Sequence, residues 1–576
     1  MKKVRKHRFV VLYVLLVFLI GFLVYGQSLF NGYVYFDDVQ FIVDNPLVHA
    51  ITFRTIWHTF TSFHPELYTP LAIASYQIDH LIGGLHPFMY HLTNLLLHII
   101  NAFLAGWFAW LLLQRQRKPK IYHIQWIAIV VSLLFLLHPI QTETVAWLAE
   151  RKGLLSTTFY LGALIAYLKY LDSDKRRTYI ICFYFFILGL LSKVMVAMLP
   201  MVFVLIDYYC KRPFTAWSVR EKTPFFILSI LFVVVGIYGE LDVVRDVSVS
   251  TMLLMAPKSI IFYLQHLFWP TGLTILHPYT QKVSILSPGF FLPLLLVAVL
   301  VAVTIWQGKK HRLVGFCIGF FLVTLIPTFL NYSWDGDIYT AAERYAYVPS
   351  LGIFLLVALQ LFQITKKQQW NIRWALSVIS IVLLSLGIKT YHQSLTWKNP
   401  ETLAHTVLRQ HPESYLAYDM LGVHYKSQEE YNDALEALLT ASTYRTDSVR
   451  VWTNLGSVYG ALGQYDRERW AYERGKEVDP SYLPLRYNLA LLHLDNEEME
   501  EALKQYEAIV ISDPDFLDAR VRLADLWLVM GFPERAKELY VQEFEHNPNS
   551  EAAAAGLLRA AKSHVRGGRS LEEWML

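Results

Sequence analysis

Residues 449–482 read VRVWTNLGSVYGALGQYDRERWAYERGKEVDPSY, and their pattern of large and small residues recurs along the chain. A leucine followed by a small residue recurs every 34 residues, as Leu455-Gly456, Leu489-Ala490 and Leu523-Ala524. A tyrosine recurs with the same period, as Tyr472, Tyr506 and Tyr540. A fixed period of this length predicts stacked helical hairpins, each of which buries its apolar face only against its neighbours.

The spacing within each unit is that of tetratricopeptide repeats. The small residues let the two helices of a hairpin approach closely, and the aromatic residues fill the groove to the next hairpin. We expect repeats from about residues 415, 449, 483 and 517, a leading helix at 399–410 and a capping helix at 551–565. Such arrays bind polypeptides in a concave groove, for which Asn454, Tyr459 and Asn488 are the candidate residues; pure scaffolding is the alternative.

The remainder of the chain has a different composition. Its 576 residues are 55% hydrophobic and only 17% charged, against about 25% charged in an ordinary soluble protein. Residues 1–391 hold 32 basic and 17 acidic residues, a net charge of +15, whereas residues 392–576 hold 19 basic and 30 acidic residues, a net charge of −11. The sequence therefore predicts an all-α protein, with a polytopic membrane domain over 1–391 and a solvated repeat domain, an α-solenoid, over 392–570.

Apolar runs long enough to cross a bilayer, about 17–25 residues, number eleven in the first domain. The segment 257–269 is interpreted as an amphipathic helix on the outer surface instead. Because Lys and Arg stay on the cytoplasmic side, the basic start at 2–8 predicts a cytoplasmic N-terminus. An odd number of spans then places the repeats outside the cytoplasm, on the outer face of a bacterial inner membrane or in an endoplasmic reticulum lumen. The runs lie near 9–27, 88–113, 124–138, 153–171, 178–191, 194–209, 225–240, 289–306, 313–331, 350–365 and 373–391.

The first outer loop carries two adjacent carboxylates, Asp37 and Asp38, among aromatic residues. Charged groups beside a membrane span are costly without a role. Neighbouring side chains of an extended segment point opposite ways, so one aspartate could face a substrate while the other is held by the protein or binds a cation. A solvated loop start, or a cap for a following helix, is the alternative.

Cationic residues gather in later outer loops. Arg151-Lys152 follows Glu150, Lys193 lies in a short turn between two apolar runs, and Arg344 follows Glu343. Arg offers bidentate donors and Lys a point charge, so a phosphate head group is a suitable ligand. The alternatives are snorkelling of Arg151 and Lys152 to the membrane interface, and a structural pair between Arg344 and Glu343.

Several short motifs, taken in order, resemble the transmembrane and tetratricopeptide-repeat O-mannosyltransferases and their bacterial relatives. The resemblance covers the order of polytopic half and repeats as well as the motifs. One departure is Thr69, where the family usually has Arg. The motifs are Asp37-Asp38 with Asn45-Pro46, Tyr68-Thr69-Pro70-Leu71, the segment from His91 to His98, the segment from His138 to Glu143, and Glu343-Arg344-Tyr345.

The resemblance implies a glycosyltransferase of the GT-C type that takes sugar from a polyprenyl-phosphate carrier and inverts the anomeric carbon. Asp37 or Asp38 would then be the general base, and Arg151, Lys152, Arg344 and Lys193 would hold the donor phosphate. The acceptor would lie outside the cytoplasm and include protein Ser/Thr. The other residues expected around the pocket are His138, Glu143, Glu343, Tyr347 and His91.

No further cofactor is indicated, since nucleotide-binding loops are absent from the sequence. A divalent cation, with Asp38 as a ligand, is left open. The expected partners are membrane lipid, the lipid-linked sugar and a protein or peptide at the repeats, with no nucleic acid. The rival hypothesis is a membrane scaffold without catalysis, whose repeats recruit a protein partner.

Overall fold

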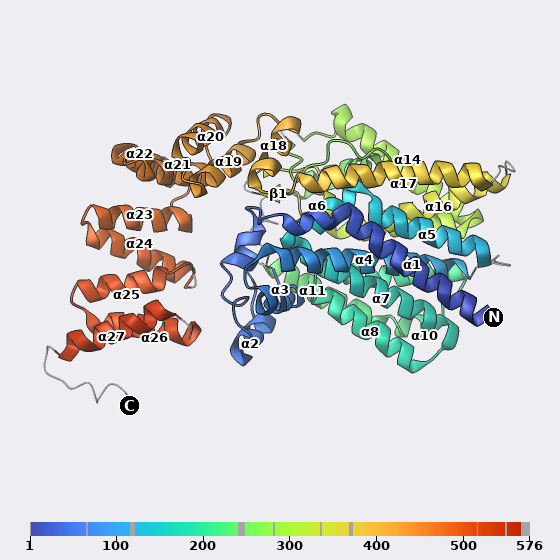
Figure 1. Ribbon diagram of the computed structural model, residues 1–576, viewed down its shortest axis with the longest axis horizontal. Coiled ribbons are helices and arrows are strands. Elements are labelled where there is room, and N and C mark those ends of the chain that lie inside the picture. The colour runs from blue at the N-terminus through green and yellow to red at the C-terminus, as the bar shows by residue number, and fades with distance from the viewer. Residues whose placement is uncertain are drawn as a thin grey trace. The chain divides into compact units, whose positions relative to one another are not determined.

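The protein is almost entirely helical (Figure 1). The computed structural model describes residues 2–64, 67–115, 121–239, 248–279, 283–334, 337–367, 372–514, 516–547 and 550–565. The exception in this part of the chain is a small antiparallel hairpin of β1 (Ser333–Trp334) and β2 (Asp337–Ile338), with Ser333 opposite Ile338. The predicted all-α class is therefore confirmed.

The chain forms two compact units, Met1–His411 and Pro412–Leu576. The division falls about twenty residues after the expected boundary at 391. Helix α18 (Pro400–Gln410), expected to lead the repeats, belongs to the first unit. Asn399 caps this helix by accepting a 2.9 Å hydrogen bond from the Thr402 backbone N–H, so the helix starts where the Asn-Pro pair favours it.

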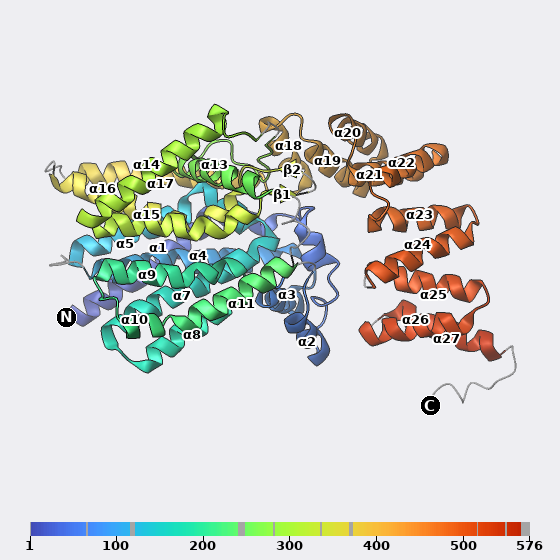
Figure 2. The same ribbon diagram turned by 180° about the vertical axis from the view of Figure 1, so that it is seen from behind.

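In the first unit, a helix lies at each of the eleven apolar runs. The eleven helices pack side by side around a large apolar core (Figure 2). They are α1 (Lys2–Tyr25), α4 (Pro87–Leu113), α5 (Ile121–Leu137), α7 (Arg151–Ser173), α8 (Arg176–Leu190), α9 (Leu199–Cys210), α11 (Thr223–Gly239), α14 (Pro288–Lys310), α15 (Arg312–Leu325), α16 (Ser350–Lys367) and α17 (Ile372–Leu395).

The count of eleven spans is not confirmed. Among the described residues, seven helices are long and apolar enough to cross a membrane, and a bent pair, His123–Leu137 with Pro139–Ala146, is an eighth if it is one span. Two further apolar helices, Val194–Cys210 and Ser350–Ile364, are shorter. Helix α8 has only 15 residues and begins with two arginines. Each apolar run predicted a helix correctly, but it did not predict whether that helix crosses the whole membrane.

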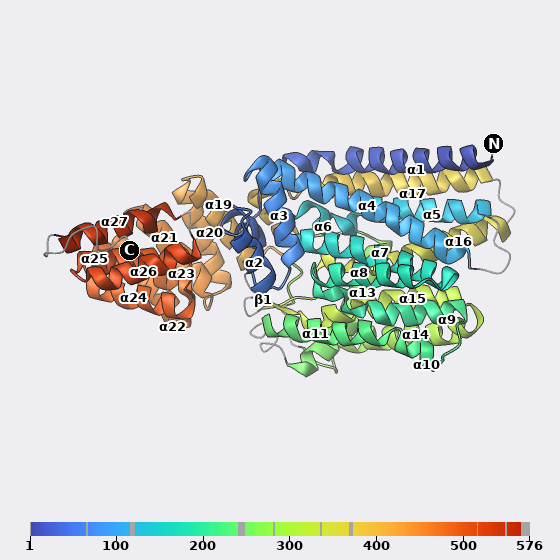
Figure 3. The ribbon, with the colours of Figure 1, turned by 90° about the horizontal axis from the view of Figure 1, so that it is seen from below.

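Shorter helices connect the long ones. The helices α2 (Phe53–Thr61), α3 (Pro70–Gly83) and α6 (Thr142–Ala146) lie at the end of the bundle opposite α10 (Ala216–Arg220) and the N-terminus (Figure 3). Helix α13 (Val249–Phe268) begins eight residues before the segment expected to form a surface helix, and Pro257 lies inside it. Four of the predicted site residues, Asp37, Lys152, Lys193 and Arg344, are brought together by these connections and helix starts.

The second unit consists of helical hairpins followed by one further helix. The first three hairpins begin at residues 415, 449 and 483, as the 34-residue period predicts, and α27 coincides with the expected capping helix. Its helices are α19 (Tyr415–Ser427), α20 (Tyr431–Tyr444), α21 (Val449–Ala461), α22 (Tyr465–Val478), α23 (Leu483–Asp495), α24 (Met499–Ser512), α25 (Ala519–Val529), α26 (Pro533–His546) and α27 (Glu551–Val565).

Close helix approach explains the small residues of the repeats. A Cβ atom added at Gly456 on α21 would overlap the ring of Tyr472 on α22. Ala490 and Ala524 take the equivalent place in the next two hairpins and are fully buried. The small side chain is thus required by contact between the paired helices, as the repeat pattern predicts.

Candidate functional site

A cavity of about 240 Å³ lies among the loops at one end of the first unit. Asp37 and the cations Lys152, Lys193 and Arg344 line it, although they come from four separate parts of the chain. The wall between them is largely aromatic and apolar. Its other lining residues are Phe36, Gln40, Phe41, Leu67, Trp147, Glu150, Ile275, Leu276, Asn331, Tyr332, Ser333, Tyr339, Ala341, Ala342 and Tyr345.

Asp37 is the carboxylate with access to the cavity. Its side chain is 36% exposed, and its Oδ2 lies 3.1 Å from Lys152 Nζ. Lys152 is itself nearly buried and lies 4.5 Å from the ring centroid of Phe41. The pair places a proton acceptor and a cation side by side at one cavity wall.

Asp38 has a different position. It is buried, and its two carboxylate oxygens accept hydrogen bonds from the backbone N–H groups of Val34, at 3.0 Å, and Ala149, at 2.9 Å. Burial raises the pKa of Asp38 to about 7, although these two hydrogen bonds favour the charged form. Asp38 therefore joins the loop after α1 to the segment that precedes Arg151, and it holds the backbone beside Asp37.

A buried carboxylate, Glu150, joins the other two cations. Lys193 Nζ lies 2.9 Å from Glu150 Oε2, and Arg344 Nε lies 3.5 Å from Glu150 Oε1. Arg344 also donates to Glu143, from Nη1 at 2.5 Å and from its backbone N–H at 2.9 Å. Burial lowers the pKa of Lys193, against the opposing charge of Glu150. An anion that entered the cavity would therefore meet two cations already held in place.

Aromatic rings limit the mobility of these cations. The Arg344 guanidinium lies 5.2 Å from the Trp147 ring centroid and 5.0 Å from that of Tyr345. Lys193 Nζ lies 5.6 Å from the centroid of Tyr345. Cation–π contacts of this kind are favourable by about 0.5–2 kcal/mol, so the positive groups are oriented before a ligand arrives.

The structure corrects the expectation that Arg151 binds donor phosphate. Its side chain is fully buried, with Nη1 2.7 Å from Asp79 Oδ2 and Nη2 donating to the Tyr90 carbonyl at 2.8 Å. Its Nε donates to Asn94 Oδ1. The guanidinium is thus enclosed by α3 and α4, where it holds the start of α7 against them.

The remaining expected pocket residues lie around the cavity rather than in its lining, within the described part of the chain. Glu143 and Glu343 are buried carboxylates. Glu343 Oε1 accepts a hydrogen bond from the Thr274 N–H at 2.6 Å and lies 3.1 Å from His277 Nε2.

The other three expected residues also contact the protein. Tyr347 OH is 2.7 Å from His98 Nδ1, inside the helix bundle. His138 caps a helical turn and contacts the Leu267 carbonyl at 3.0 Å. His91 is buried in α4. Hydrogen bonds to the protein account for the positions of Glu143, Glu343, Tyr347 and His138, and packing within α4 accounts for that of His91.

For a metal, the described residues offer no group of three or more His, Cys, Asp or Glu side chains placed to hold an ion. Both oxygens of Asp38 are engaged by backbone N–H groups. Asp38 therefore has a structural position, with both carboxylate oxygens bonded to the backbone.

In the repeats, the three expected groove residues differ in their surroundings. Asn454 donates to the buried Asp419 at 2.7 Å, and Arg450 Nε donates to the same carboxylate at 2.8 Å, so this cluster joins two neighbouring repeats. Tyr459 is buried in an apolar cluster and does not face an open groove, because the aromatic at this repeat position fills space between helices. Asn488 is half-buried on α23.

Sequence reasoning did not single out Glu150, Trp147 or Asp79 as site residues. Glu150 stands directly before Arg151-Lys152, and an acid beside two cations in an apolar context is a signal that could have identified it. Asp79 lies within α3, where an isolated carboxylate in an apolar helix predicts a buried partner. Trp147 carried no comparable signal.

The fold and the cavity together define a polytopic helical membrane protein that carries tetratricopeptide repeats and a charged, aromatic-lined cavity. Residues 449–482 match the family described as tetratricopeptide repeat. Solved repeat structures resemble the chain locally: the crystal structure of MamA protein, 17% identical over 27% of this chain and 84% of that one, with a TM-score of 0.24, and a thermophilic repeat protein of Thermus thermophilus, 21% identical over 32% and 95%, with a TM-score of 0.25.

Among individual proteins, the chain is similar to protein O-mannosyl-transferase TMTC3 of Homo sapiens, with 24% identity over 91% of this chain and 63% of the relative. The Tmtc3 protein of Drosophila melanogaster is 23% identical over 86% of this chain and 64% of its own. Human TMTC4 is 32% identical over 26% of this chain and 22% of its own length. The resemblance seen in the sequence motifs is confirmed, and the chain spans just under two thirds of the length of the TMTC3 relatives.

Proposed function

We propose that this protein is an integral-membrane glycosyltransferase, which moves a sugar from a polyprenyl-phosphate carrier to an acceptor outside the cytoplasm. The main support is the approach of Asp37 to Lys152 in a cavity that Lys193 and Arg344 also line. Similarity to named protein O-mannosyl-transferases supports the same reaction class and makes a Ser or Thr hydroxyl of a protein the proposed acceptor.

Asp37 is the proposed general base. It would take the proton of the acceptor hydroxyl while the hydroxyl oxygen bonds to the anomeric carbon and the bond from that carbon to the phosphate oxygen breaks. A carboxylate base typically contributes a factor of about 10²–10⁴ in rate. We assign this role to Asp37 because Asp38 is buried and bonded to backbone on both oxygens.

The cations would stabilise the leaving phosphate. Charge builds on that group as its bond to the sugar breaks, and fixed cations in a cavity interact with such charge more strongly than water does. Lys193 and Arg344 are held by Glu150, so they need no reorganisation during the reaction. Lys152 lies beside the base and is the cation nearest to the site of proton transfer.

The repeat unit is proposed to hold a polypeptide. Its stacked hairpins form the kind of array that binds extended chains, and the match at residues 449–482 supports this class of unit. For the orientation we retain the prediction that the repeats and the cavity are on the side of the membrane away from the cytoplasm.

A transfer assay tests the proposal. Purified membranes that contain the protein are incubated with labelled polyprenyl-phosphate sugars, and label on protein is measured for the wild type, Asp37→Asn and Asp44→Asn. Asp44 is an exposed acid of the same loop and serves as the matched control. We expect Asp37→Asn to lose at least about a hundredfold in rate and Asp44→Asn to keep the wild-type rate. Equal activity of the two variants would remove Asp37 as the base.

A further inference from the structure

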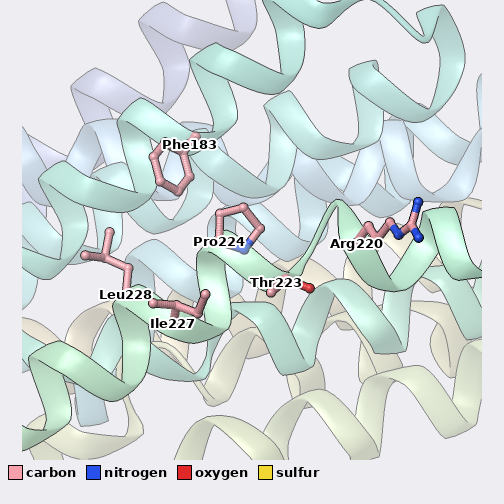
Figure 4. Close-up of a pocket in the computed structure, with 6 residues that line it drawn as sticks. All are labelled: Phe183, Arg220, Thr223, Pro224, Ile227 and Leu228. Atoms are coloured by element: carbon pink, nitrogen blue, oxygen red, sulfur yellow. The ribbon is translucent and has the colours of Figure 1, made fainter.

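A second hollow lies on the first unit beside α10, at the end of the bundle opposite α2 and α3 (Figure 3), and Figure 4 shows the residues that line it. It has a volume of about 540 Å³ and is lined by Phe183 of α8, Arg220 of α10, and Thr223, Pro224, Ile227 and Leu228 at the start of α11. Figure 4 shows Arg220 at one end of this row and Phe183, Ile227 and Leu228 at the other, with Thr223 and Pro224 between them. The hollow is thus polar at one end and apolar along the rest.

The surface around the hollow is suited to lipid rather than to water. The stretch Ala216–Gly239 is a candidate span, and only 17% of its apolar window is buried inside the protein. Ile227 is 63% exposed, Ile230 65% and Val234 60%. Contiguous exposed apolar surface of this kind is stable in contact with acyl chains.

Arg220 differs in its surroundings from the two charged residues that follow it. Glu221 and Lys222 turn inward and are buried: Lys222 Nζ lies 2.9 Å from Glu221 Oε1 and 2.6 Å from Asp207 Oδ2. Arg212 forms a second ion pair with Glu221. Arg220 is exposed and has no ion pair with any residue in the described ranges. The buried pairs fix the turn between α10 and α11, and the Arg220 guanidinium stays at the end of the hollow.

Other residues mark the same end of the bundle as the membrane interface. Trp217, on α10, is 62% exposed, and Phe214, just before it, is 88% exposed. Aromatic side chains concentrate where the acyl region meets the head groups. Arg176 and Arg177 are exposed at the start of α8, the helix that contributes Phe183. Basic and aromatic groups therefore gather at the same helix ends as the hollow, a combination that is typical of the level of phospholipid head groups.

We propose that this hollow binds one anionic phospholipid, with an acyl chain along the groove between α8 and α11 and the head-group phosphate on Arg220. The occupant is a lipid because Arg220 supplies the charge for a phosphate and the rest of the groove supplies apolar contact. The anionic class follows from the charge of Arg220 and from the nearby Arg176 and Arg177. Two exposed acids precede these arginines: Asp172 is paired with Arg115, and Asp174 stands next to Lys175. This site is independent of the proposed transferase reaction.

Native mass spectrometry tests the site. The full-length protein is released from nanodiscs that contain phosphatidylglycerol and phosphatidylcholine with the same acyl chains, and the retained lipids are counted. Three variants are compared: Arg220→Gln, Arg220→Lys and Arg409→Gln, the last on an exposed arginine of α18 outside the candidate spans. Thermal melting in detergent reports that each variant is folded.

We expect Arg220→Gln to lower phosphatidylglycerol retention about fivefold, the effect of one cation near an anionic head group. Phosphatidylcholine retention should stay as in the wild type. Arg220→Lys should keep most of the binding, and Arg409→Gln all of it. Glycerol phosphate, a head group without acyl chains, should not be retained. Equal retention of both lipids by the wild type, unchanged phosphatidylglycerol retention in Arg220→Gln, or retention of glycerol phosphate would each overturn the proposal.

Discussion

Lys152 Nζ lies 3.1 Å from Asp37 Oδ2, although 115 residues separate them in the chain. The contact joins the loop after α1 to the first turn of α7, and it forms one wall of the cavity. Helices that alternate in direction bring such loops to the same end of a bundle. The pair therefore brings together a carboxylate and a cation from distant segments, and under the proposed function these would accept a proton and stabilise charge.

Substitution of Lys152 should weaken use of the donor. In Lys152→Met the phosphate loses one charged hydrogen-bond donor, worth about 1.5–3 kcal/mol, so kcat/KM for a polyprenyl-phosphate sugar should fall by about 10–100-fold. Initial rates over a range of donor concentrations measure this. Lys398→Met, at an exposed lysine beyond α17, should leave kcat/KM unchanged. An unaltered kcat/KM in Lys152→Met would exclude the lysine from donor binding.

Asp38 should make stability depend on pH. Its pKa is about 7 in the folded protein and near its ordinary value of 3.8 in the unfolded chain. The folded state therefore binds more protons between these values, and the contribution of Asp38 to stability is fully present below about pH 4 and is lost as pH rises through about 7. Melting temperatures from pH 4 to pH 8 should fall less steeply in Asp38→Asn than in the wild type. Parallel pH profiles for the two proteins would contradict this assignment.

Much of the fold was predictable because its signals are local. The 34-residue period depends on contacts between adjacent helices, such as Gly456 against Tyr472, so helix starts at 415, 449 and 483 follow from spacing alone. Each apolar run likewise formed a helix. Membrane depth is a different matter, because length, tilt and burial inside the bundle decide it. For α8 and α9, tilt and burial depend on which helices pack against them, and the sequence does not show which helices those are.

For the site, the sequence indicated which loops meet but not which side chain of a pair faces the cavity. Arg151 and Lys152 are adjacent, and their chemistry suits phosphate equally well. The buried acceptors Asp79 and Asn94 draw Arg151 into the bundle, whereas Lys152 turns to Asp37. Those acceptors lie on α3 and α4, far away in sequence. Three-dimensional packing decides which of two adjacent side chains faces the cavity, and the local sequence pattern cannot predict it.

Glu150 should be required for both stability and the arrangement of the cavity. Glu150→Gln removes the carboxylate that Lys193 contacts and one of the two that Arg344 contacts, so the largely buried Lys193 loses its charge partner while Arg344 keeps Glu143. Loss of one partner from a buried ion pair costs about 3–5 kcal/mol, so we expect a clear fall in melting temperature in detergent. Glu401→Gln, at an acid in the first turn of α18, is the comparison and should melt like the wild type. A Glu150→Gln protein with wild-type melting would show that the two cations need no common anion.

The repeat unit should be sensitive to added volume at one helix contact and tolerant of it nearby. Gly456→Val places a branched side chain where even a Cβ overlaps Tyr472, whereas Ala461→Val adds similar volume at an exposed position of the same helix. Overpacking of this kind costs about 1–3 kcal/mol. Hydrogen exchange of the full-length protein should therefore become faster over α21 and α22 in Gly456→Val, while exchange over α4 and α7 stays as in the wild type. Because neighbouring repeats stabilise one another, we expect the faster exchange to extend into α19 and α23. If Ala461→Val produced the same change, the effect would come from the branched side chain in a helix and not from contact between the paired helices.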